Sequence, residues 1–174
     1  MAKNEIELIY FNKVGDIMAN FKTNAMRMLD SAKVSYETYT YESDGDFDGQ
    51  SVAKKIGKDP AQVFKTLVTA SPSKNYYVFV LPVLNELDLK AAAKAVGEKS
   101  VEMIAVKDIN KVTGYIRGGC SPIGMKKQFV TVIDDSCLLF DTIIFSAGKI
   151  GYQLEVSPQA LVTLIGAKCE KIIR

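Results

Sequence analysis

A single lysine interrupts the apolar, β-prone segment 63–70 (VFKTLVTA). With the two-residue period of a strand, Lys65 shares a face with Val63 and Leu67. An ammonium group placed there loses hydration unless something compensates for the loss. Two interpretations stay open at this point. The side chain reaches water from an edge strand, or it lies at the floor of a pocket and binds a phosphate, carboxylate or carbonyl oxygen.

A glycine-rich segment, residues 113–127 (TGYIRGGCSPIGMKK), is the second candidate. The adjacent Gly118 and Gly119 let a ligand approach the backbone and can turn amide groups inward to stabilise an oxyanion. A tight surface turn explains the same glycines equally well. The segment matches neither GxGxxG nor GxxxxGK[ST], so it gives no support to a nucleotide-binding loop. Lys126 and Lys127 are placed to contact a phosphate backbone, although most such pairs are merely solvated.

The chain contains no histidine. This excludes Ser-His-Asp and Cys-His catalysis, histidine general bases and HExxH metal sites. Cys120 therefore has no histidine to activate its thiol, and we expect it to be passive. Ser146 and Lys149 follow the end of a predicted strand, where polar residues either line a site or simply end the strand. Asp134 and Asp135 are adjacent and point in different directions, so we expect no metal and no cofactor.

The bulk composition favours one globular domain. The chain has 174 residues, of which 48% are hydrophobic and 24% charged, with a net charge of +2. Any contact with RNA must therefore come from local basic clusters. The three cysteines are widely spaced and form no CxxC, which fits a reducing cytoplasm. No secretion signal opens the chain and no apolar run suits a membrane span.

These candidate residues need elements to position them. Apolar periodicity predicts a helix after Thr23 or Asn24, a short helix from Ser51 to Gly57, a helix from Asp88 to Gly97, and a helix from Ser157 through Ile165. A short helical turn is expected at 107–114. Strands are expected at 35–42, 63–70, 76–83, 100–106, 129–134, 141–148, 152–156 and 168–174.

Helices and strands are interleaved irregularly, and segments 63–70 and 76–83 are close enough to form a hairpin. This order predicts an α/β domain in an α+β arrangement, with helices around a mixed sheet. Residues 1–20 stand apart as an N-terminal arm to which we assign no role. Residues 21–174 form the predicted domain.

Several motifs occur in a fixed order: VFKTLV, LDLKAAAKAVG, VEM, TGYIRGGCSPIGMKK, TVID and FDTIIFSAGK. In this order they resemble the YbaK/ProX-like aminoacyl-tRNA editing domains, above all the YbaK branch of Cys-tRNA(Pro) deacylases. The resemblance runs from about Thr23 to Arg174. It implies a mixed, partly closed sheet beside a small pocket, and hydrolysis of cysteine wrongly attached to proline tRNA. Such a second sieve is needed because a pocket rejects a similar side chain by only about 1–3 kcal/mol.

The resemblance also assigns residues. It implies that Lys65 is the essential lysine and that Tyr41, the Gly118–Gly119 turn and Ser146 bind substrate. The implied mechanism is substrate-assisted: the cysteinyl thiol attacks its own ester carbonyl and leaves as a strained cyclic thioester. This chain departs from the family's usual motifs by GGCS in place of GGIS, by SAGK in place of SGGK, and by a serine after Tyr41-Glu42 where many relatives have histidine.

The sequence therefore predicts an enzyme, a deacylase acting in trans on Cys-tRNA(Pro). Its expected partners are the acceptor end of an aminoacyl-tRNA and prolyl-tRNA synthetase. Lys126, Lys127 and Lys149 are the expected contacts to the tRNA backbone, and no membrane is involved. Two alternatives remain: another specificity, such as alanine on proline tRNA, and a non-catalytic module that binds a tRNA end or a nucleotide on the same fold.

Overall fold

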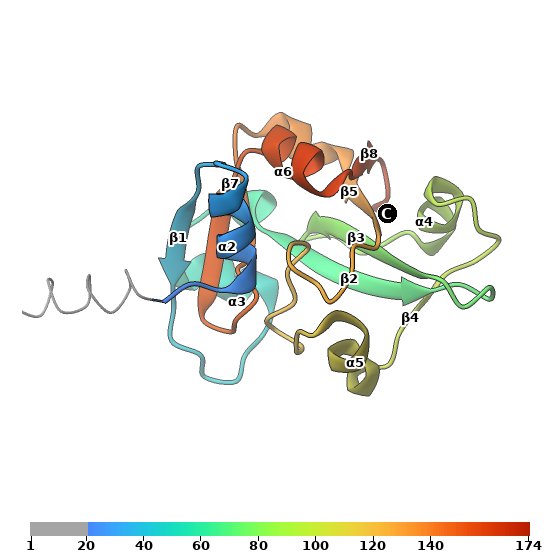
Figure 1. Ribbon diagram of the computed structural model, residues 1–174, viewed down its shortest axis with the longest axis horizontal. Coiled ribbons are helices and arrows are strands. Elements are labelled where there is room, and N and C mark those ends of the chain that lie inside the picture. The colour runs from blue at the N-terminus through green and yellow to red at the C-terminus, as the bar shows by residue number, and fades with distance from the viewer. Residues whose placement is uncertain (1–20) are drawn as a thin grey trace, which may run out of the picture.

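The computed structural model describes residues 21–174, and the predicted arm at residues 1–20 lies outside the described residues (Figure 1). The helices are α2 (Asn24–Ser31), α3 (Gly49–Lys55), α4 (Leu89–Ala95), α5 (Ile109–Thr113) and α6 (Pro158–Ile165), with 3-10 turns η1 (Pro60–Gln62), η2 (Val106–Asp108) and η3 (Asp135–Leu139). The strands are β1 (Glu37–Thr40), β2 (Phe64–Ala70), β3 (Tyr76–Pro82), β4 (Glu102–Met103), β5 (Val130–Asp134), β6 (Ile143–Ser146), β7 (Tyr152–Val156) and β8 (Lys168–Glu170).

Side-chain caps set the starts of the helices, as the sequence predicts. The hydroxyl of Thr23 accepts from the Met26 amide at α2, and the carboxylate of Asp88 accepts from two amides at α4. Helix α3 begins two residues before the expected Ser51, because the Asp48 carboxylate accepts from the Ser51 amide and caps the helix at that point.

The strands divide into two sheets. A five-stranded mixed sheet has the order β4-β2-β3-β5-β8, and a three-stranded antiparallel sheet has the order β1-β7-β6. The expected β2–β3 hairpin is present, while β5 runs parallel to β3 and to β8. The predicted α/β class with a mixed sheet is confirmed. The sheet is not closed, because among the described residues a single bridge, Val63 to Ile144, joins β2 to the smaller sheet.

Several strands are shorter than the sequence predicts. β1 covers 37–40 of the expected 35–42, and β6 covers 143–146 of the expected 141–148. β4 covers only two residues of the expected 100–106. The Ile104 amide makes the last bond to β2, at the Val68 carbonyl, and the chain then turns away into η2. β8 stops at Glu170 because the amide of Ile172 donates to the Asp134 carboxylate and leaves the ladder.

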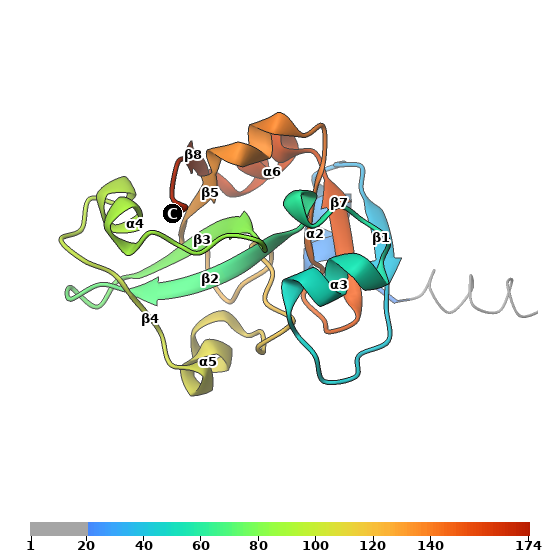
Figure 2. The ribbon, with the colours of Figure 1, turned by 180° about the vertical axis from the view of Figure 1, so that it is seen from behind.

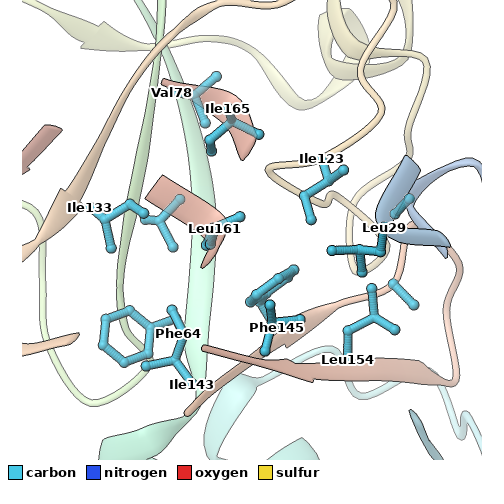
Figure 3. Packing of buried hydrophobic residues seen from close by; sticks show 14 of the residues in the cluster. Leu29, Phe64, Val78, Ile123, Ile133, Ile143, Phe145, Leu154, Leu161 and Ile165 are labelled. Carbon is cyan, nitrogen blue, oxygen red and sulfur yellow. The ribbon is translucent and has the colours of Figure 1, made fainter. Parts of the chain in front are cut away.

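The core lies on both faces of the large sheet. On one face, residues of β2, β3 and β5 pack with α2, α6 and the small sheet through Leu29, Phe145 and Leu161 (Figure 3). On the other face, Phe79 and Ile172 pack against α4. Figures 1 and 2 show α4 and α5 on opposite sides of the β2–β3 hairpin. None of the helices between residues 21 and 174 has the length and hydrophobicity that crossing a bilayer requires.

Candidate active site

A cavity of about 920 Å³ follows the edge of β2 that faces away from β3. Its walls come from the first half of β2, the loop 41–49, the segment 103–109, the glycine-rich loop and the ends of β6 and β7. Four residues singled out in the sequence line it together: Tyr41, Lys65, Gly118 and Ser146. They come from four segments that are far apart in the chain, so the fold brings the predicted substrate-binding residues into one place.

The edge of β2 is open at this cavity. The Val63 carbonyl accepts from the amide of Val83, just after β3, whereas the Val68 carbonyl accepts from Ile104 on the opposite side. Because peptide groups alternate along a strand, those of Thr66 must point away from β3 and toward the open edge. The Thr66 hydroxyl is buried and has no hydrogen-bond partner within residues 21–174. The peptide groups of Thr66, rather than this inaccessible hydroxyl, therefore face the cavity.

Lys65 occupies this edge and is half-buried. Its partner in the β2–β3 ladder is Leu81, which places it on the α4 face of the sheet. Burial lowers the pKa of Lys65 below that of a free lysine, and the charges of Glu86 and Asp48 oppose this decrease. No ion pair engages its ammonium group within the described part of the chain. The cavity therefore contains a partly desolvated cation that has no direct ion-pair partner among residues 21–174.

The Gly118–Gly119 pair forms a tight turn. Gly118 has φ +85°, and the Gly119 amide donates to the Ile116 carbonyl at 3.0 Å. Gly118 lines the cavity beneath the ring of Phe47. Gly119 is not among the lining residues and packs against the backbone of Ile150. The expectation that both amides turn inward is therefore wrong for Gly119, because its amide closes the turn.

Ser146 ends β6 and pairs with Gln153 of β7 across the small sheet. Its hydroxyl accepts from the Gly148 amide at 3.2 Å. Gln153 also lines the cavity and is only 5% exposed. No side-chain hydrogen bond joins Gln153 to another residue between Phe21 and Arg174. Gln153 was not among the residues predicted for the site. The signal for it in the sequence is a glutamine next to the buried Leu154 in a short strand.

Two more lining residues were not predicted from the sequence. Arg117 and Asp48 stand at the cavity on the glycine-rich loop and on the loop before α3. Arg117 supplies a second positive charge that is exposed to solvent. Charged residues on loops carry no periodic signal, so only the tertiary structure places them in the lining of the same cavity as Lys65.

Cys120 lines the cavity too. Burial raises the pKa of its thiol to about 11. At neutral pH the sulfur is therefore protonated and a poor nucleophile. This agrees with the passive role expected from the sequence.

The three lysines expected to contact the tRNA backbone lie outside the cavity lining. Lys126 donates to the Lys111 carbonyl at 3.2 Å, and Lys127 lies 5.2 Å from the centre of the Phe129 ring. The ammonium of Lys149 lies 4.2 Å from the centre of the Phe21 ring. The structure thus separates these lysines from the group around Lys65.

The chain matches a known family of protein domains. Residues 47–164 match the model of the aminoacyl-tRNA editing domain. The matched range contains the lining segments of β2, the glycine-rich loop, β6 and β7. The chain belongs to the aminoacyl-tRNA editing domain family. This confirms the resemblance seen in the sequence and the predicted class of enzyme, an aminoacyl-tRNA editing hydrolase.

A curated member of this family resembles the chain along most of its length. The chain is 47% identical over 152 residues, which is 87% of this chain and 93% of the relative, to the "Putative Cys-tRNA(Pro)/Cys-tRNA(Cys) deacylase EbsC" of Enterococcus faecalis (strain ATCC 700802 / V583).

Two solved structures share the fold. The hypothetical protein APE2540 matches with a TM-score of 0.80 at 20% identity, covering 87% of this chain and all of that one. A "putative trans-editing enzyme for prolyl tRNA synthetase" matches with a TM-score of 0.75 at 20% identity, covering 89% of this chain and 99% of that one. At this identity the two matches establish the fold alone.

Proposed function

We propose that the protein is a trans-acting deacylase that hydrolyses cysteine from misacylated Cys-tRNA(Pro). One observation carries the proposal: Lys65 is a partly desolvated cation without an ion-pair partner among residues 21–174, at the open edge of β2 inside a cavity. A preorganised positive charge in a site of low polarity stabilises the oxyanion that develops at an ester carbonyl. The name of the 47% identical relative supports the same substrate class.

The nucleophile in this proposal is the substrate's own thiol. As a thiolate, the cysteinyl sulfur attacks the ester carbonyl, and negative charge develops on the carbonyl oxygen beside Lys65. The carbon–oxygen bond to the tRNA then breaks, the terminal ribose oxygen takes up a proton, and a strained cyclic thioester leaves. Water hydrolyses that thioester to cysteine. A thiol with a pKa near 8.5 supplies enough thiolate at neutral pH.

The residues of the cavity support a nucleophile that comes from the substrate and not from the protein. Cys120 is held as a thiol by its raised pKa of about 11. The Ser146 hydroxyl accepts a hydrogen bond from Gly148 and has no histidine to deprotonate it. The protein therefore contributes charge and positioning, which can lower the barrier of an intramolecular reaction by several kcal/mol.

The acceptor end of the tRNA is the proposed partner, with prolyl-tRNA synthetase supplying the misacylated product in the cytoplasm. One similar structure is described as a trans-editing enzyme for that synthetase. With a net charge of only +2, the chain has little general attraction for RNA. Delivery of the substrate by a synthetase offsets that weakness.

The test is a deacylation assay with Cys-tRNA(Pro), Ala-tRNA(Pro) and Ser-tRNA(Pro). Wild type should release cysteine fastest, and Lys65→Ala should lose at least about 100-fold in rate, which is the usual effect of removing an oxyanion-stabilising group. Lys90→Ala, at an exposed lysine of α4 outside the cavity lining, serves as the matched control and should retain activity.

Other outcomes separate the alternatives. Decay at the uncatalysed rate in all tubes would show that the protein is a binding module. Selective release of alanine would establish the other specificity. If serine were released as fast as cysteine, the substrate thiol would have no role.

A further inference from the structure

Two of the three cysteines lie in contact with each other. Cys137, in η3, is fully buried, and Cys169, in β8, is partly exposed. Their sulfur atoms are 3.7 Å apart. At this separation no other atom fits between the two sulfurs, and neither residue lines the cavity.

The scaffold holds this pair together. β5 and β8 run parallel with Ile133 opposite Cys169, and η3 turns back directly after β5. The buried carboxylate of Asp134 fixes both segments, since it accepts from the amide of Ser136 at 3.1 Å and from the amide of Ile172 at 2.9 Å. The approach of the two sulfurs is therefore imposed by backbone hydrogen bonds on either side of them.

We propose that Cys137 and Cys169 form an intramolecular disulfide when the folded protein meets a low-molecular-weight disulfide. Cys169 reacts first because it alone is accessible to solvent. Its thiolate attacks one sulfur of the small disulfide, forming a mixed disulfide and releasing one small thiolate. Cys137 then loses its proton and attacks the Cys169 sulfur, which releases the second small thiolate. The two cysteines are oxidised, and one small disulfide is reduced to two thiols.

The burial of Cys137 determines which of the two cysteines reacts first. It raises the pKa of the Cys137 thiol to about 12, and the nearby Cys169 sulfur contributes to the increase. Cys137 is therefore inert toward reagents in solution. Its attack becomes effective only once a mixed disulfide is held beside it, because the reaction is then intramolecular.

The disulfide would close a ring over residues 138–168. This ring contains β6 and β7, the strands that carry Ser146 and Gln153 to the cavity. A cross-link that closes a loop of about 30 residues restricts the unfolded chain substantially and is expected to raise the unfolding midpoint by about 5–10 °C. The pair is thus a redox-dependent cross-link that stabilises the segment forming one wall of the site.

The experiment incubates the folded, full-length protein with oxidised glutathione. Thiols titrated after denaturation should fall from three to one, and peptide mass spectrometry should find residues 137 and 169 cross-linked. The thermal midpoint should rise and return to its starting value after reduction. Cys120→Ser, which leaves the pair intact, should fall from two thiols to none.

Two variants separate the steps. Cys137→Ser should stop at a stable mixed disulfide on Cys169, and Cys169→Ser should keep both of its thiols. Three remaining thiols in the wild type, or a wild-type mixed disulfide that persists without ring closure, would overturn the proposal. Cross-linking that occurs only in urea concentrations that unfold the chain would overturn it as well.

Discussion

The ring of Phe47 occupies the space that a side chain at Gly118 would need. A Cβ added to Gly118 would lie 2.6 Å from Cδ1 of Phe47, and the φ of Gly118 is +85°. The glycine is therefore required for two reasons, the left-handed backbone and the ring above it. The loop that carries Phe47 and the glycine-rich loop close on one another at the cavity.

Gly118→Ala should lower the deacylation rate far more than a glycine-to-alanine change of similar cost in stability elsewhere in the chain. The strained backbone costs about 1–2 kcal/mol, while the displaced Phe47 ring disturbs the cavity. Gly97→Ala is the matched control, because Gly97 also has a positive φ and open space around it, but lies at the end of α4. We expect similar losses in the free energy of unfolding and at least a 10-fold larger loss of deacylation rate for Gly118→Ala. Equal activity in the two variants would contradict this.

The rate of deacylation should depend on the charge of Lys65. Burial lowers the pKa of this lysine, so the enzyme should lose activity as pH rises through a value below 10.5. In Lys65→Arg the guanidinium stays charged, and any remaining activity should lack this decrease. Rates measured from pH 6 to 10 and corrected for hydrolysis without enzyme check the prediction. A profile shared by both enzymes would exclude Lys65 as the titrating group.

The same desolvation has a cost in stability. Because the pKa of Lys65 is lower in the folded than in the unfolded chain, folding is disfavoured while the lysine is charged. The free energy of unfolding therefore includes a penalty at neutral pH that disappears as pH rises through the folded pKa toward 10.5.

Gln153→Leu should separate activity from stability. Gln153 is only 5% exposed, yet its side-chain amide forms no hydrogen bond with another group between residues 21 and 174. Its replacement leaves no protein group unpaired, so the free energy of unfolding should fall by less than about 1 kcal/mol or rise. Deacylation should fall at least about 10-fold, because the substrate loses a polar contact. Urea titration and initial rates measure the two effects, and unchanged rates would remove Gln153 from the site.

Cys120→Ser should keep deacylation within about 2-fold of wild type. With a pKa of about 11, only about one in 10,000 of the Cys120 side chains is a thiolate at pH 7. Alkylation of Cys120 in the folded protein should accordingly be much slower than alkylation of a free thiol. Abolished activity in Cys120→Ser would show that the protein, and not the substrate, supplies the nucleophile.

Glu155→Gln should lower stability in a way that depends on pH. The carboxylate accepts from Thr142 at 2.6 Å and from Tyr39, and it pairs with Lys58 at 3.5 Å. Burial alone would raise the pKa of Glu155, but these partners together lower it. Their contribution is present above the unfolded pKa and is lost as pH falls through the folded pKa. The variant should lose about 1–2 kcal/mol at pH 7, and the difference from wild type should shrink at pH 3.

Local signals in the sequence predict a helix or strand well where a single residue sets its start or its end. Asp88 caps α4 because its carboxylate bonds two amides, and Gly166 ends α6 with a positive φ. The hairpin of β2 and β3 follows from two apolar strands with a short connection. These features depend on neighbours in the chain.

The cavity depends on neighbours in space, which periodicity and spacing alone do not predict. The pattern of segment 63–70 favours an edge strand over a pocket for Lys65, and the structure contains both, because the open edge of β2 is itself the wall of the cavity. The Gly119 amide closes a turn onto Ile116, which glycine content does not reveal. Gln153 becomes polar surface of the cavity only when β6 and β7 pair.

An unpaired strand edge normally invites another chain to add a strand, which is one route to aggregation. In this protein the exposed stretch of β2, around Thr66, lies inside the cavity between the loop 41–49 and the segment 103–109. A small ligand can reach these peptide groups, but a second polypeptide strand is kept away by both walls. The enclosure that admits a substrate thus also protects the protein from self-association through its own sheet.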